Sequence, residues 1–211
     1  MPSRRSLQTM ICLVVSLVLA ACATQPERND VLMDTGVPLT DNMRAYDVDR
    51  DTLRHEILVD RQSIAGSATV AFDVLSPMDV LELNFDGHYD IDRVVSDGEV
   101  LDYRQTESKL YIDLTDTMQA GESGSVTVHY AGRPVEAQRP PWEGGFTWSE
   151  TPSGEPWIAT SFQGEGCDIW WPCKDHPADE TGGVDLFITV PGDLVVASNG
   201  VLVDVSDTPP G

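Results

Sequence analysis

The chain has 211 residues, of which 35 are acidic and 13 are Lys or Arg, so its formal net charge is −22. That length predicts one domain with a sizeable core, or one domain with a small appendage. The acidic balance excludes a nucleic-acid partner, because phosphate binding needs clustered Lys and Arg. Such acidity keeps a protein soluble and attracts cationic or zwitterionic ligands only weakly.

Residues 1–21 have the composition of an export signal and are excluded from the fold. Arg4 and Arg5 form a basic start, and an apolar run from Met10 to Ala21 follows. That run is shorter than the roughly 20 residues that a membrane-spanning helix needs. We therefore expect an exported protein.

The signal ends in Leu19-Ala20-Ala21-Cys22, which resembles a bacterial lipobox. This pattern predicts cleavage before Cys22 and a lipid anchor on its thiol, which would hold the protein at a membrane surface. Ala23, rather than Asp, comes next, which by analogy with bacterial sorting favours the outer membrane, facing the periplasm. The alternative is an ordinary signal peptide with a chance cysteine.

Residues 22–43 are polar and aperiodic and predict a flexible tether, and residues 44–211 predict the folded domain. From Tyr46 onward apolar and polar residues alternate, and no helical stripe is present outside the signal. We expect an all-β fold of twisted antiparallel sheets packed as a β-sandwich. The expected strands include 64–74, 81–85, 110–114, 126–130, 186–190, 194–198 and 201–205.

Short turn sequences separate these expected strands. They are Asp86-Gly87, Asp97-Gly98, Gly121 and Gly124. Asn199-Gly200, between the last two expected strands, is the strongest hairpin signal in the chain.

All five tryptophans lie between residues 141 and 175, together with several glycines. Within this stretch Glu165 stands between Gly164 and Gly166. A carboxylate flanked by glycines and followed by bulky aromatics suggests a lined pocket. The alternative is a loop-rich corner of the core that is filled by aromatic rings.

The motifs of this stretch carry a family resemblance. They read P-W-x-G-G-F-x-W, then P-W-I-A-T-S, Q-G-E-G and W-W-P-C-K-D-x-P-x-D-E. This succession resembles the N-terminal domain of aminopeptidase N type zinc metallopeptidases, a family that includes the leukotriene hydrolase branch. The resemblance is specific over residues 142–180 and looser back to about Tyr46. It implies a large β-domain that precedes a zinc-binding catalytic domain.

The resemblance also implies roles for two residues. Glu165 would bind the free α-ammonium of a peptide substrate, with Gln163 beside it. An ionised carboxylate makes a charge-assisted hydrogen bond to an ammonium, which suits this role. The alternative is a surface Glu in a glycine-rich turn. Three further acidic residues, Asp175, Asp179 and Glu180, are interpreted as solvated or turn-capping residues with structural roles.

A zinc peptidase of this kind needs H-E-x-x-H on a helix, so that both His ligands share one face. The chain has His55-Glu56, but Ile57, Leu58 and Val59 follow, and no second His. We expect His55 to be an ordinary strand residue. The sequence therefore predicts that this chain binds no zinc and contains no catalytic residue, and that zinc belongs to a catalytic domain absent from it.

Two cysteines remain after Cys12 and the lipidation candidate Cys22, namely Cys167 and Cys173. In an exported protein they could form a disulfide. The alternative is two buried thiols packed among the tryptophans. A third alternative is a soft metal site that includes His176.

Two functions are compatible with these observations. The first is the substrate-amine-anchoring N-terminal domain of an exported, lipid-anchored zinc aminopeptidase. On this interpretation the chain is a fragment that stops before the catalytic domain. The second is a non-catalytic β-sandwich lipoprotein that acts as a binding or assembly module. A carbohydrate-binding sandwich would leave Gln163 and Glu165 unexplained.

Overall fold

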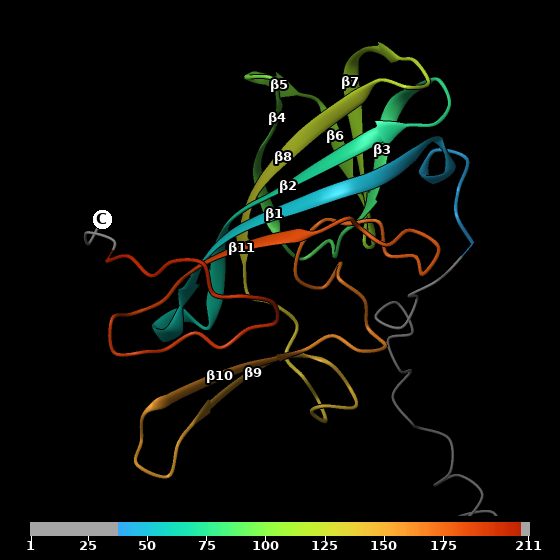
Figure 1. Ribbon diagram of the computed structural model, residues 1–211. Helices are drawn as coiled ribbons and strands as arrows, with labels where there is room; N and C mark the ends of the chain where they lie inside the picture. Colours follow the sequence, from blue (N-terminus) through green and yellow to red (C-terminus); the bar gives the residue numbers. More distant parts are fainter. Residues whose placement is uncertain (1–37, 208–211) are drawn as a thin grey trace, which may run out of the picture. The chain divides into compact units, whose positions relative to one another are not determined.

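The structure is a computed structural model, and it describes residues 38–207 (Figure 1). Strands dominate this part of the chain, and no α-helix occurs within it. Two short 3-10 helices, η2 (Met43–Ala45) and η3 (Val59–Arg61), flank the first strand. The strands are β1 (Tyr46–Leu58), β2 (Ser63–Val74), β3 (Met78–Asn84), β4 (Asp90–Ser96), β5 (Glu99–Leu101), β6 (Tyr103–Gln105), β7 (Lys109–Met118), β8 (Ser123–Gly132), β9 (Gly145–Glu150), β10 (Pro156–Ser161) and β11 (Val184–Thr189). The expected all-β class is confirmed.

The strands form three sheets. The largest has the order β11-β1-β2-β8-β4-β5, a second has the order β3-β7-β6, and β9 pairs with β10 alone. Neighbouring strands are antiparallel except β1 and β11, which run parallel with Leu53 opposite Leu186. A parallel edge strand needs a long crossover, and here the whole aromatic stretch lies between β8 and β11 in the chain.

The core lies between the six-stranded and the three-stranded sheet. Alternate residues of β2, including Ile64, Val70 and Phe72, are buried, as the period-two pattern predicts. Leu83 of β3 and Ile112 of β7 are fully buried in the same apolar cluster. Two sheets that share one core in this way are consistent with the predicted β-sandwich.

The Asp97-Gly98 turn is confirmed as a tight hairpin. β4 ends at Ser96 and β5 begins at Glu99, and these two residues are paired. Asp97 and Gly98 have φ angles of 48° and 86°. Positive φ at both central positions is typical of a type I′ two-residue hairpin turn, and Asp and Gly tolerate it.

The hairpin expected around Asn199-Gly200 is wrong. Neither 194–198 nor 201–205 is a strand in the structure. A hairpin that buries neither face is only marginally stable in water, whatever its turn sequence. The exposed fractions are 78–94% for the five residues Val195, Val201, Leu202, Val203 and Val205.

The segment before η2 contacts the sheets. Thr40 donates its hydroxyl to Glu82 of β3 at 2.8 Å, and Asn42 donates to the same carboxylate oxygen at 3.3 Å. Met43 is buried, with 2% of its surface exposed. The last residues of the region assigned to the tether therefore pack on the domain. Residues 1–37, including Cys22, lie outside the described residues.

Candidate functional site

Glu165 lies on a tight turn directly after β10, here called the Glu165 turn (residues 162–166). The carbonyl oxygen of Phe162 accepts hydrogen bonds from the N–H groups of Glu165 at 3.1 Å and Gly166 at 3.2 Å. Gly164 and Gly166 have φ angles of 89° and 95°. Glycine adopts this left-handed region without steric cost, so the G-E-G sequence is what lets the chain reverse on both sides of the carboxylate.

The Glu165 side chain is buried, with 6% of its surface exposed. Its Oε1 accepts a hydrogen bond from the backbone N–H of Gly144 at 2.9 Å. Within the described part of the chain this is the only donor on the carboxylate. A carboxylate has about four lone-pair sites, so Glu165 keeps acceptor capacity for a further donor. The alternative of a surface Glu is wrong.

Gly144 fits against the turn because it has no side chain. A Cβ there would lie 2.2 Å from the Ser161 carbonyl oxygen and 2.7 Å from Cγ of Glu165. The glycine lets the segment before β9 approach the turn after β10 closely. Its N–H group is thereby brought to the carboxylate.

Gln163 lies on the same turn, but its side chain is exposed. No hydrogen bond joins its side chain to Glu165 or to another residue within 38–207. The structure therefore brings the two residues onto one turn, while the two side chains have different surroundings.

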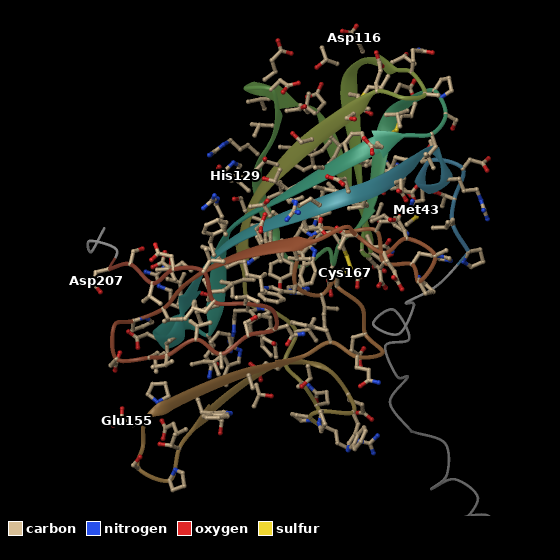
Figure 2. All side chains as sticks on the ribbon, viewed as in Figure 1. Met43, Asp116, His129, Glu155, Cys167 and Asp207 are labelled. Carbon is tan, nitrogen blue, oxygen red and sulfur yellow. A yellow bond between two sulfur atoms is a disulfide. The ribbon has the colours of Figure 1, made fainter. Side chains whose placement is uncertain are left out.

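Cys167 and Cys173 form a disulfide with a Cα–Cα distance of 6.3 Å (Figure 2). Of the three alternatives for these cysteines, the free thiols and the metal site with His176 are therefore wrong. A sulfur bound in a disulfide is not available as a thiolate ligand. The bridge begins two residues after Glu165.

The segment inside the disulfide is fixed to the core by its backbone. Cys173 and Asn84 of β3 exchange two hydrogen bonds, at 2.7 and 3.0 Å. Tyr89 donates its hydroxyl to the Ile169 carbonyl at 2.8 Å, and Tyr130 donates to the Trp170 carbonyl at 2.7 Å. These bonds satisfy carbonyl groups that the burial of the segment removes from water.

The five tryptophans separate into two groups. Trp148, Trp170 and Trp171 pack against the core, and the Phe162 ring stacks on Trp170 with centroids 5.1 Å apart. Trp142 and Trp157 are instead 74% and 59% exposed. Aromatic filling of a core corner therefore explains three of the five rings, and the other two face solvent.

His55 is a buried residue of β1, with 2% of its surface exposed. Tyr130 gives its only hydroxyl proton to Trp170, so His55 Nε2 must donate to the Tyr130 oxygen, 2.6 Å away. Burial lowers the pKa of His55 from 6.5 to about 4, and the ring is neutral at pH 7. The prediction that His55 is an ordinary strand residue is confirmed.

A buried ion pair that the sequence does not predict joins the end of the aromatic stretch to β1. Lys174 and Asp179 form the pair, with side chains only 5% and 2% exposed. Lys174 Nζ also donates to the Tyr46 carbonyl at 2.6 Å, and Val48 donates its N–H to Asp179 Oδ1 at 3.2 Å. Asp179 is thus structural, as expected, but buried and not solvated. No sequence signal reveals such a pair, because Lys and Asp in a loop are usually exposed.

Asp51 of β1 is a second buried carboxylate close to this pair. Burial, together with the negative charge of Asp179, raises the pKa of Asp51 from 3.8 to about 6. Its Oδ1 has no hydrogen-bond partner among the described residues. Asp51 therefore destabilises the fold when it is ionised.

Among residues 38–207, no three His, Cys, Asp or Glu side chains gather in a way that could hold a metal ion. The same part of the chain contains no helix that is long and apolar enough to span a membrane. At Glu165 the carboxylate has lone pairs left beyond the Gly144 hydrogen bond, and an ionised carboxylate of this kind can accept hydrogen bonds from a donor-rich or cationic group.

No protein-family model matches the chain, and no curated protein matches it in sequence. Solved structures do match. A mutant M1 zinc metallopeptidase from Deinococcus radiodurans, bound to a Tyr-Ser-Ala substrate, is 20% identical with a TM-score of 0.63. The fold is that of part of an M1 zinc metallopeptidase. The match covers 83% of this chain and 40% of that one.

Two further structures show the same likeness. A two-domain M1 zinc metallopeptidase mutant bound to L-arginine is 22% identical with a TM-score of 0.62, and the match covers 78% of this chain and 37% of that one. Yeast leukotriene A4 hydrolase is 19% identical with a TM-score of 0.66, over 92% of this chain and 29% of the hydrolase. The predicted resemblance is confirmed at the level of the fold. The chain spans less than half the length of each of these proteins.

Proposed function

We propose that the chain is the N-terminal, substrate-anchoring domain of a zinc aminopeptidase that removes N-terminal residues from peptides. The observation that carries the proposal is the buried Glu165 carboxylate, held by the Gly144 N–H on a fold shared with M1 zinc metallopeptidases. Two of the similar proteins were solved with L-arginine and with a Tyr-Ser-Ala substrate. Both of these molecules carry a free α-amino group.

Glu165 would supply the negative charge for the α-ammonium of the peptide. One oxygen of the carboxylate is oriented by Gly144, and the remaining lone pairs are free for a ligand donor. A charge-assisted hydrogen bond of this kind is typically worth ~1.5–3 kcal/mol. The exposed Gln163 would add a neutral acceptor at the same turn. An anchor of this kind measures substrate position from the N-terminus, which is what an aminopeptidase requires.

Zinc is the metal named for the similar metallopeptidases. A zinc ion does not fit the described residues of this chain. His55 is buried and hydrogen-bonded to Tyr130, and no cluster of metal ligands is present among residues 38–207. We therefore assign the metal and the bond-breaking chemistry to a separate catalytic domain. This chain would contribute the recognition of the substrate amine.

For the N-terminus we propose export and lipid anchoring through Cys22, with the outer membrane as the location. The Leu19-Ala20-Ala21-Cys22 pattern supports this proposal. Cys22→Ser should abolish labelling by a fatty-acid probe and release the protein from the membrane fraction. Unchanged labelling and membrane association in the variant would contradict it.

The alternative function is a non-catalytic β-sandwich lipoprotein that acts as a binding or assembly module. The deciding experiment expresses the complete reading frame that contains the chain, together with any adjacent open reading frame that encodes H-E-x-x-H. We expect one zinc per catalytic domain and chelator-sensitive hydrolysis of aminoacyl reporters. If neither the reading frame nor a partner supplies zinc-dependent hydrolysis, the chain is a binding or assembly module.

A further inference from the structure

We propose that the Cys167–Cys173 disulfide is a positioning device for Glu165, which couples the orientation of this carboxylate to the thiol–disulfide state of the protein. The importance of Glu165 for a substrate amine rests on the proposed function. The positioning itself is a property of this chain and can be measured without a substrate.

Cys173 is the fixed end of the bridge. It is buried, with 3% of its surface exposed, and it exchanges two backbone hydrogen bonds with Asn84 at the end of β3. The Asn84 side chain also accepts a hydrogen bond from the N–H of Asp175 at 3.2 Å. The bridge is therefore anchored in the three-stranded sheet, which belongs to the core.

Cys167 is the other end, and only Gly166 separates it from Glu165. Gly166 is tightly enclosed, since a Cβ there would lie 2.3 Å from Oδ2 of Asp175 and 2.7 Å from Oδ1 of Asp168. Gly166 is therefore a confined one-residue connection between the bridge and Glu165. Cys167 is only partly buried, unlike Cys173.

The rest of the enclosed segment has its own attachments to the core. Three of its carbonyl groups accept hydrogen bonds from the core. Asp86 donates its N–H to the Asp168 carbonyl, Tyr89 donates its hydroxyl to that of Ile169, and Tyr130 donates its hydroxyl to that of Trp170. Cleavage of the bridge should therefore leave residues 168–170 in place. What it removes is the covalent link between Cys167 and Cys173, which ties the Glu165 turn to β3. The turn then keeps the hydrogen bonds of the Cys167 carbonyl to the Trp170 and Trp171 N–H groups, the stacking of Phe162 on Trp170 and the Gly144 N–H bond. The structure thus predicts a local effect.

An exported protein meets oxidising conditions, under which such a bridge persists. Its reduction by a dithiol transfers two electrons to the disulfide and a proton to each cysteine sulfur, while the dithiol becomes a cyclic disulfide. Reduction would leave the charge of Glu165 intact and loosen its position. The affinity for a peptide amine would then fall without any change in the residues that contact it.

The Gly144 amide provides a direct measurement, because its proton is donated to Glu165. We suggest amide hydrogen exchange followed by NMR on the oxidised protein, the dithiothreitol-reduced protein and a Cys167→Ser/Cys173→Ser variant. The control amides are Phe146, whose N–H donates to the Val135 carbonyl at 2.7 Å, and Leu53 on β1, which is paired on both sides in the largest sheet. We expect Gly144 exchange to accelerate about ten-fold or more in both reduced forms, with less than about two-fold change at the controls.

Glu165→Ala provides the calibration. It should accelerate Gly144 exchange with the disulfide intact, and adding the two cysteine substitutions should accelerate it little further. Unchanged Gly144 exchange on reduction would overturn the proposal. Equal acceleration of exchange at Gly144, Phe146 and Leu53 would also overturn it, because the disulfide would then stabilise the whole domain and not the position of Glu165. These outcomes are independent of the proposed function, which fails separately if Glu165 substitutions leave peptide hydrolysis unchanged.

Discussion

Gly144 and Glu165 are 21 residues apart in the chain, yet the backbone N–H of Gly144 donates to the buried Glu165 carboxylate at 2.9 Å. This bond joins the start of the β9–β10 sheet to the turn that follows it. The contact is possible because Gly144 has no side chain. Substituting a residue with a side chain at this position tests how much the close approach matters.

Gly144→Ala should destabilise the protein and displace Glu165. The new Cβ would lie 2.2 Å from the Ser161 carbonyl oxygen, which is backbone and cannot rotate away. Overpacking of this kind typically costs ~1–3 kcal/mol. Gly192→Ala is the matched control, because a Cβ there meets nothing within 4 Å. Urea unfolding of the two variants measures the difference, and equal free energies of unfolding would contradict the close approach at Gly144.

His55 should make the protein less stable in mild acid. Because burial lowers its pKa from 6.5 to about 4, the unfolded chain binds a proton in this range more readily than the folded chain. The stabilisation is fully present above pH 6.5 and is lost as the pH falls toward 4. His55→Gln should remove roughly 3 kcal/mol of this pH dependence. Chemical unfolding at a series of pH values tests this, and parallel curves for both proteins would show that His55 does not titrate as described.

Asp51 should act in the opposite direction over an overlapping range. Its pKa is raised from 3.8 to about 6 by burial and by Asp179, so the folded protein holds the proton more tightly. The stability it contributes is present below pH 3.8 and is lost as the pH rises through about 6.

When the pH rises from 4 to 8, the unfolding free energy of Asp51→Asn should therefore increase by roughly 2–3 kcal/mol relative to that of the parent. Asp47→Asn, at an exposed position on the same strand, is the control. The quantity to compare is the change in unfolding free energy with pH, since it is independent of the fixed cost of each substitution. A difference between variant and parent that does not vary with pH would place the titration elsewhere.

Sequence patterns predicted the strands that bury one face. β2 and β8 alternate between core and surface, and 64–74 and 126–130 were predicted accordingly. The Asp97-Gly98 turn formed a hairpin because Val94 and Leu101, one on each of its strands, are buried. Asn199-Gly200 did not, although its turn chemistry is equally good, because its flanking residues are exposed. Turn chemistry sets the geometry of a hairpin, and burial supplies its stability.

The candidate site was predictable in part. The two glycines beside Glu165 indicated a sharp reversal, and the structure shows left-handed backbone at both. The family resemblance singled out Glu165 and Gln163, but the sequence alone could not indicate that Gly144 would bind one of them. Contacts over 21 residues depend on how the sheets pack, and so does the buried pair of Lys174 and Asp179.

The binding of a peptide α-ammonium by Glu165 can be tested in the polypeptide or complex that contains both this chain and an H-E-x-x-H domain. Glu165→Ala should lower kcat/KM for free N-terminal peptides by roughly ten- to a hundred-fold, because the ammonium loses its counter-charge. Glu165→Gln should lose less, since its amide oxygen still accepts a hydrogen bond. Glu155→Ala, at an exposed position in the β9–β10 turn (Figure 2), is the control and should leave kcat/KM unchanged.

The most direct measurement compares kcat/KM for a free peptide with that for its N-acetylated form in the parent and in Glu165→Ala. Acetylation removes the ammonium, so the acetylated peptide should be a poor substrate for the parent and little affected by the substitution. The ratio of the two kcat/KM values should therefore fall by roughly ten- to a hundred-fold in the variant, while thermal melting stays close to that of the parent. An unchanged ratio would remove Glu165 from amine recognition, and a loss of activity toward both peptides with a matching fall in Tm would show that its role is structural.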